Sequence, residues 1–155
     1  MLILGVDPGL NSTGWAVVRK SGSLIDYIKS GVIKTSPKEK LANRLLIINQ
    51  AVQQIIKLYC PNQFAIEETF VNKNPLSSLM LGQARAASIL AAASANLEVY
   101  EYASKFVKKT ITGNGSAEKS QVGFMVKILA PKALLNSSDE SDALAVAITH
   151  SNFCK

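Results

Sequence analysis

Short apolar runs alternate with turn residues over the first part of the chain. Leu2 to Val6 is a continuous apolar run of strand length, and turn-forming residues follow it from Pro8 to Gly14. Apolar residues return at Trp15 to Arg19 and again at Leu24 to Ile33, with the turn Ser21-Gly22-Ser23 between them. Three strands joined by short turns predict an antiparallel meander.

Helical and strand patterns then follow one another. From Pro37 to Tyr59 apolar residues recur every three or four positions, which predicts an amphipathic helix that begins at Pro37. A fourth strand is expected to end at Glu67, and a fifth to run from Leu97 to Tyr102. Further helices are expected at 76–95, at 104–110, from about Glu118 with Ser116 as its N-cap, and from about Asp139 to Asn152.

The order βββαβαβααα predicts an α/β fold in which strands 1, 4 and 5 are parallel neighbours. We therefore expect a five-stranded mixed sheet, with three antiparallel strands and then parallel strands, flanked by helices. At 155 residues with 48% apolar residues, the chain is expected to form a single domain over residues 1–155.

The charge balance adds a hint about partners. With 17 basic and 11 acidic residues the net charge is +6, which favours an anionic partner such as nucleic acid. Cys60 and Cys154 lack metal-site spacing and are expected to be reduced thiols. No signal peptide or membrane-length apolar stretch is recognised, so a cytoplasmic location and no membrane partner are expected.

Four acids stand where the predicted elements end or begin. Asp7 ends the first strand, Glu67 ends the fourth, and Asp139 and Asp142 open the last helix three residues apart, on one helical face. Ligand sites of open α/β sheets lie at the carboxyl ends of parallel strands. Converging carboxylates repel, and hard cations such as Mg²⁺ or Mn²⁺ relieve that repulsion. The pattern predicts metal-assisted phosphodiester chemistry, although Asp139 alone also suits a helix N-cap. Only one of Glu67 and its neighbour Glu68 should face the site, because strand neighbours point to opposite sides.

Five segments together resemble a known family. They are Gly5 to Gly9 with Thr13-Gly14, Ala65 to Glu67, Leu81 to Arg85, Gly115 to Val122, and Asp142 to Ala145. In this order, over nearly the whole chain, they resemble the RuvC family of Holliday junction endodeoxyribonucleases within the ribonuclease H-like superfamily. The resemblance implies a homodimer that cuts four-way DNA junctions by symmetric paired nicks in recombination and repair, leaving 5′-phosphate ends. It also implies two Mg²⁺ ions per active site, with Mn²⁺ as a substitute, and a branch-migration motor complex as a partner.

The resemblance also assigns residue roles. Asp7, Glu67, Asp139 and Asp142 take the family's four acidic positions as metal ligands and catalytic residues, and Lys119 joins them as a catalytic residue. The DNA contacts it implies are Phe70, Lys73, Lys108, Lys109, Ser116 and Lys119. The resemblance does not decide between Lys108 and Lys109. The alternative for Phe70 is a core side chain, and for Lys108 and Lys119 a solvated helix face. Glu68 departs from the family, which commonly has Gln there.

Two other functions fit part of the sequence. A non-catalytic DNA-junction binding module would keep the basic surface but has no use for four converging acids. An actin-like ATPase lobe shares the turn Asp7-Pro8-Gly9, but such proteins need two lobes. His150, the only histidine, is expected to be a structural or surface residue rather than a general base. The helix at 76–95, rich in small residues, suits either a subunit interface or burial against the sheet.

Overall fold

The computed structural model describes residues 1–69 and 74–154. Within these residues the strands β1 (Leu2–Asp7), β2 (Ser12–Ser21), β3 (Leu24–Lys34), β4 (Gln63–Glu67) and β5 (Val99–Tyr102) form one sheet in the order β3-β2-β1-β4-β5. The pairs β1–β2 and β2–β3 are antiparallel, and the pairs β1–β4 and β4–β5 are parallel. The predicted mixed sheet, with strands 1, 4 and 5 as parallel neighbours, is confirmed.

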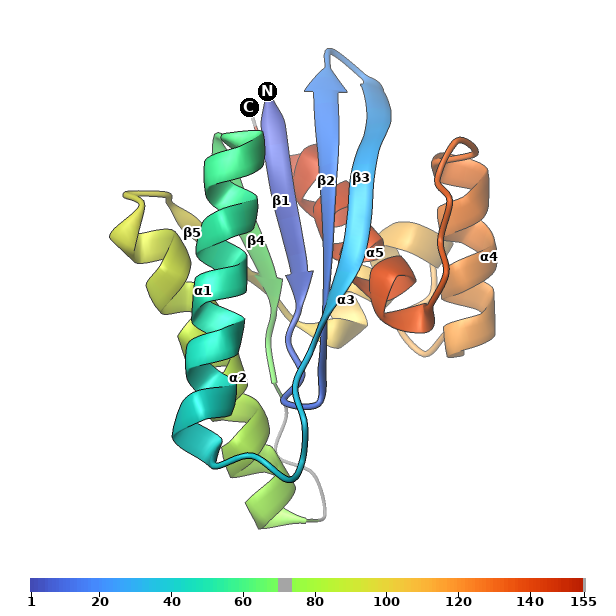
Figure 1. Cartoon of the computed structure of the whole chain (residues 1–155). Helices are drawn as coiled ribbons and strands as arrows, with labels where there is room; N and C mark the ends of the chain where they lie inside the picture. The colour runs from blue at the N-terminus through green and yellow to red at the C-terminus, as the bar shows by residue number, and fades with distance from the viewer. Residues whose placement is uncertain (70–73, 155) are drawn as a thin grey trace.

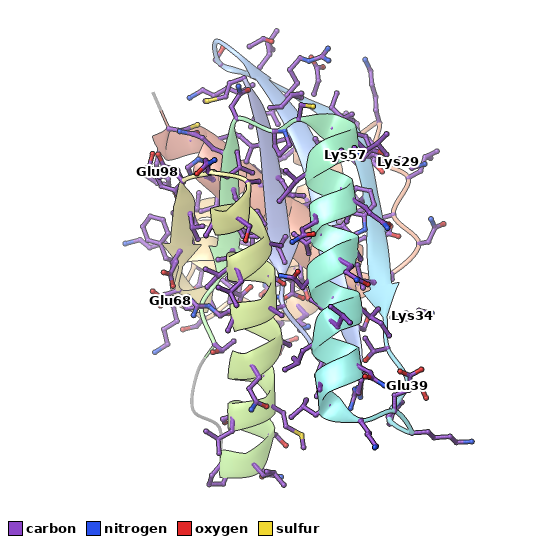
Figure 2. The ribbon with its side chains drawn as sticks, turned by 60° about the vertical axis from the view of Figure 1, so that its left-hand side comes forward. Lys29, Lys34, Glu39, Lys57, Glu68 and Glu98 are labelled. Atoms are coloured by element: carbon purple, nitrogen blue, oxygen red, sulfur yellow. The ribbon has the colours of Figure 1, made fainter. Side chains whose placement is uncertain are left out.

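Helices cover both faces of this sheet (Figure 1). The helices α1 (Leu41–Tyr59) and α2 (Pro75–Ser94) lie side by side on one face, as Figure 2 also shows. The helices α3 (Ser104–Thr112), α4 (Lys119–Leu129) and α5 (Ser138–Phe153) belong to the other face. Along β1 the side chains alternate, so that Ile3 joins the core under α5 while Leu4 and Val6 join the core under α1 and α2. Burial on both faces explains why β1 is a continuous apolar run.

Two glycines set how closely α5 approaches the sheet. A Cβ added at Gly5 would lie 2.5 Å from the backbone oxygen of Ala143, and one added at Gly14 would lie 2.0 Å from the backbone oxygen of Asp139. Neither distance is physically possible, so only glycine permits α5 to cross β1 and β2 at this depth. This close crossing brings the first two turns of α5 to the carboxyl end of β1.

Two predicted helix starts are wrong. The first helix begins at Leu41 rather than Pro37, because residues after Pro37 form a turn in which the Glu39 N–H donates to the Ser36 oxygen (3.1 Å). Ser116 is not the N-cap of α4. That position is held by Glu118, whose N–H donates to Gln121 Oε1 at 2.9 Å.

The last helix begins one residue earlier than predicted. Its N-cap is Ser137, whose hydroxyl accepts a hydrogen bond from the Glu140 N–H at 3.2 Å. Asp139 is therefore inside the first turn, and the alternative that it serves merely as an N-cap does not hold. Carboxylates in the first turn are favoured by the positive end of the helix dipole.

The helix α2 is apolar and only partly buried. Its buried residues are Ala84, Ala87, Ser88, Ala91 and Ala92. Over its 20 residues α2 is long and apolar enough to cross a membrane, with 28% of its apolar window buried, so the expectation that no stretch reaches that length is wrong. Composition alone does not separate a span from a core helix. Here α2 packs against α1, and its Arg85 forms an ion pair with Glu101 of β5.

Candidate active site

Three parallel strands end at the same level of the sheet. Val6 of β1 stands opposite Ile66 of β4, so the next residues, Asp7 and Glu67, leave their strands side by side. The chain beyond β5 supplies Ser104, which forms a side-chain hydrogen bond with Glu67. The two carboxylates thus meet at the carboxyl edge of the sheet, where the sequence placed them.

The helix α5 contributes the other two carboxylates. Asp142 lines a small cavity of about 90 Å³ together with Asp7 and Glu67. Asp139, one turn earlier, accepts a hydrogen bond from the hydroxyl of Ser12 at the start of β2. Three of the four acids therefore share one cavity, and the fourth lies beside it on the β2 side.

Burial and like charges strongly disfavour ionisation of Asp7. Desolvation is the largest cause, followed by the charges of Glu67 and Asp142, and together they raise the pKa of Asp7 from 3.8 to about 8. The pKa of Glu67 is also raised, chiefly by burial, although the Ser104 hydrogen bond opposes that shift. Burial and the neighbouring acids outweigh the nearby lysine charge, so the Asp7 carboxylate favours either a proton or a bound cation.

Two lysines border the acids. Lys119, the first residue of α4, donates to Asp142 Oδ2 at 2.8 Å, while most of its side chain remains exposed. This hydrogen bond and the surrounding carboxylates raise the pKa of Lys119, so it stays cationic. Lys108 of α3 lines the same cavity, whereas Lys109 is exposed. The structure brings Lys108 rather than Lys109 to the carboxylates.

The acids fit a hard cation chemically but already have partners in the protein. Among residues 1–69 and 74–154, no three His, Cys, Asp or Glu side chains are arranged to hold a metal ion directly. Asp142 is paired with Lys119, Asp139 with Ser12, and Glu67 with Ser104. The expected convergence of all four carboxylates is therefore looser than the sequence suggested. Coordination of Mg²⁺ or Mn²⁺ by this oxygen-only set requires these side chains to exchange their internal partners for the ion.

Comparison with known proteins decides the family. The family model of crossover junction endodeoxyribonuclease RuvC matches residues 3–150. The chain is 52% identical over 148 residues to the crossover junction endodeoxyribonuclease RuvC of Beijerinckia indica, covering 96% of this chain and 85% of that protein. It is 47% identical over 150 residues to that of Rickettsia akari, covering 96% of each. The chain belongs to the RuvC family.

A solved RuvC structure agrees with this assignment. The structure of T. thermophilus RuvC in complex with Holliday junction substrate is similar with a TM-score of 0.90 and 33% identity, covering 97% of this chain and 93% of that one. The fold is therefore ribonuclease H-like, and the chain is a crossover junction endodeoxyribonuclease that acts in DNA recombination and repair. The RuvC family is a family of metal-dependent nucleases.

The remaining predicted site residues fall in different places. Phe70 and Lys73 lie outside the described residues. Ser116 is exposed, and its N–H donates to Asn114 Oδ1 at 2.9 Å, so this N–H is already engaged. Glu68 is exposed (Figure 2) and is absent from the lining of the cavity that holds Asp142, although it lines a second cavity together with Asp7 and Glu67. As expected from strand alternation, Glu67 and not Glu68 faces Asp142.

Sequence reasoning missed several polar residues that support this RuvC site. Ser104 follows the end of β5, so the predicted strand order was enough to find it. Ser12 gave no signal, because its contact with Asp139 spans 127 residues. Glu140 is buried between the Ser30 hydroxyl (3.2 Å) and the Asn136 N–H (2.9 Å), where it holds the chain before α5 against β3.

His150 is a buried structural residue, so of the two expected placements the surface one is wrong. It is 1% exposed, its Nδ1 lies 2.7 Å from the Tyr102 hydroxyl, and its Nε2 lies 2.9 Å from Gln63 Oε1. Burial and the charge of Lys20 lower the pKa of His150 from 6.5 to about 4.

We expect His150 to remain neutral down to about pH 4. Between pH 6.5 and 4 the unfolded chain binds this proton and the folded chain does not, so the contribution of His150 to stability falls as the pH falls. Because the chain has one histidine, its imidazole NMR signals are assigned without ambiguity. A titration midpoint near 6.5 would contradict the buried network.

Proposed function

We propose that this RuvC family member resolves four-way DNA junctions with Mg²⁺, as a homodimer that makes one nick in each of two strands. The observation that carries the proposal is the cavity in which Asp7, Glu67 and Asp142 from three separate elements lie beside Lys108 and Lys119. A buried aspartate beside two other acids, with its pKa raised to about 8, is typical of a functional site.

The proposed metal ligands are Asp7, Glu67, Asp139 and Asp142. Two Mg²⁺ ions bound there, with Mn²⁺ accepted in their place, would supply a water polarised for attack and stabilisation of the leaving 3′-oxygen. Asp7 and Glu67 are fixed by adjacent strands, so their backbone positions are set before substrate binds. Rigid strand ends suit a site that must hold a phosphodiester in one orientation.

The lysines are proposed to act on the phosphate. Lys119 is released from Asp142 when that carboxylate takes a different partner, and its ammonium then lies next to the cavity where the scissile phosphate is expected. A cation in this place offsets the negative charge that develops during hydrolysis. The other proposed DNA contacts are Phe70, Lys73, Lys108, Lys109 and Ser116; of these, Lys108 is supported by its position in the cavity.

A labelled four-way junction tests this function. We expect wild-type protein with Mg²⁺ or Mn²⁺ to give two symmetric nicks with 5′-phosphate ends, and no product in EDTA. A linear duplex of the same sequence is the control for junction structure. Binding without nicks in a full series of divalent metals would favour the non-catalytic binding module.

Paired nicks require two active sites in fixed geometry, which a two-fold dimer provides. The exposed side of α2 is the proposed contact surface. Leu76, Leu79 and Leu90 are 61%, 67% and 61% exposed, and they lie on one helical face at intervals of 3 and 11 residues. Such an apolar surface opposite a packed one is typical of a subunit contact.

We expect Leu79→Lys to weaken the dimer by about tenfold or more, because an unpaired charge in an apolar contact costs more than the about 1–3 kcal/mol of a neutral polar group. Sedimentation equilibrium measures the change, and paired nicking should become single nicking. Leu24→Lys is the matched control, since Leu24 is 69% exposed at the start of β3. An unchanged dimer in Leu79→Lys would exclude this face.

The cellular context is also a proposal. The described cysteines, Cys60 and Cys154, are free thiols, which suits a reducing compartment, and we propose the cytoplasm. A branch-migration motor complex is proposed as a further partner on the resemblance to the family.

A further inference from the structure

A groove between α4 and the start of α5 adjoins the active site. Its volume is about 540 Å³, far larger than the 90 Å³ cavity of the carboxylates. Lys119 and Asp142 line both spaces, so the groove and the cavity adjoin at this ion pair. A DNA strand with one phosphate at the carboxylates would therefore have this groove directly beside it.

The helix α4 carries a glycine, Gly123, where it lines the groove. An added Cβ at Gly123 would have Ser141 Oγ, at 3.7 Å, as its nearest neighbour, which is ordinary contact. Alanine would fit there and would favour the helix by up to about 1 kcal/mol. The Ser141 hydroxyl oxygen is itself buried without a hydrogen-bond partner in the described part of the chain. A space lined by the unpaired Ser141 hydroxyl therefore lies between Gly123 and α5, the helix that carries Asp139 and Asp142.

The charges around the groove favour an anion. Lys119 and Lys127 line it from α4, and Ser137 and Ser138 line it at the N-terminal end of α5, where the helix dipole is positive. Among the described lining residues Asp142 is the only acid, and it is already paired with Lys119.

An exposed aromatic ring stands at the edge of the groove. Phe124 is 65% exposed and also borders a second groove of about 410 Å³ on the other side of α4, so its ring forms a ridge between the two. An exposed phenyl ring next to cationic side chains is the arrangement on which proteins stack nucleobases. The folded chain itself has little use for the ring there.

We propose that this groove binds the DNA strand as it leaves the scissile phosphate, with a neighbouring phosphate against Lys127 and the serine hydroxyls and a base against Phe124. The proposal rests on the proposed function, because it takes the carboxylate cavity as the position of the scissile phosphate. Lys127 and Phe124 are then positioning residues that fix which phosphodiester reaches the carboxylates.

Junction binding in EDTA, measured by fluorescence anisotropy over a series of salt concentrations, tests the phosphate contact. Lys127→Gln is expected to weaken binding and to reduce the slope of log K against log salt by about one. Lys57→Gln is the matched control, because Lys57 lies in the last turn of α1, before β4 begins and so away from its carboxyl end (Figure 2). Equal slopes for the two variants would overturn the phosphate contact.

A 2-aminopurine placed at each of the three nucleotides flanking the nick tests the stacking contact. One position should change its fluorescence on binding, and Phe124→Ala should abolish that change and weaken binding by at least about fivefold. Gly123→Gln, which fills the groove, should weaken binding and shift or slow the nick, while Gly123→Ala should do neither. Glutamine and alanine both favour a helix more than glycine does, so neither variant should melt below the wild type. A loss of binding at an unchanged melting temperature is then due to the side chain in the groove and not to unfolding of the protein.

The outcomes also separate the two proposals. If wild-type protein gives no metal-dependent nicks, the proposed function fails. If it nicks the junction while Lys127→Gln, Phe124→Ala and Gly123→Gln bind and cut as their controls do, only the groove proposal fails.

Discussion

Asp7→Asn is expected to reduce junction cleavage by more than about 10³-fold while junction binding is retained or strengthened. The substitution removes the carboxylate at the centre of the acidic cluster. Removing one positioned hydrogen-bond donor from an active site already lowers kcat by about 10²–10³-fold, and the loss of this carboxylate should lower it further. It also removes a negative charge near the expected phosphate position. Single-turnover cleavage and anisotropy on the same labelled junction measure the two effects. Loss of binding together with cleavage would contradict the assignment of Asp7.

The same variant should be more stable than the wild type without metal. Because the pKa of Asp7 is raised from 3.8 to about 8, the unfolded chain releases this proton between pH 4 and 8 while the folded chain keeps it. The wild type therefore loses stability as the pH rises through this window, and asparagine does not. Below pH 4 the unfolding free energies of Asp7→Asn and the wild type should differ little. Above pH 8 the unfolding free energy of Asp7→Asn should be several kcal/mol higher, at about 1.4 kcal/mol per pKa unit.

Controls separate this effect from general changes in charge. Asp26→Asn makes the same chemical change at an exposed position on β3 and should leave both cleavage and melting temperature as in the wild type. Saturating Mg²⁺ should narrow the stability gap between wild type and Asp7→Asn, because the ion stabilises the buried, ionised Asp7 and offsets its repulsion from Glu67 and Asp142. A gap that does not depend on pH would show that the acids do not crowd one another.

Gly14→Ala is expected to have the largest effect on the fold and to impair catalysis with it. The new methyl group would lie 2.0 Å from the backbone oxygen of Asp139, so the first turn of α5 must move away from β2. Forced overpacking of this kind costs about 1–3 kcal/mol or more. The shift would carry Asp139 and Asp142 away from Asp7, so cleavage should fall further than the loss of stability explains.

Thermal melting and cleavage at a temperature where the variant is folded separate these effects. Gly82→Ala is the stability control, since nothing lies within 4 Å of a Cβ added in the middle of α2, and its melting temperature should stay equal or rise. Wild-type melting and cleavage in Gly14→Ala would contradict the close crossing of α5 over the sheet.

The pattern of apolar residues was enough to predict the sheet. The five strands, their order and the parallel pairing of β1, β4 and β5 follow from hydrophobic runs, turn residues and the handedness of crossovers, all of which are local or general. The same reasoning placed Asp7 and Glu67 together, because parallel neighbours end at a common edge. Helix starts were less certain, since Pro37 and Ser116 are good helix-start residues whose segments are held as turns by the surrounding chain.

What the sequence determined, then, is the fold, the pair of strand-end carboxylates and, through its motifs, the RuvC family. Tertiary structure alone decided which side chains the acids touch: Ser12 on Asp139, Lys119 on Asp142, and Lys108 rather than Lys109 at the cavity. It also left leucines of α2 exposed and formed the groove between α4 and the start of α5 that Gly123 lines. Strand periodicity depends only on residues that are neighbours in the sequence. The contacts of the acids depend instead on how deeply α5 crosses Gly5 and Gly14, and on side chains that are far apart in the chain.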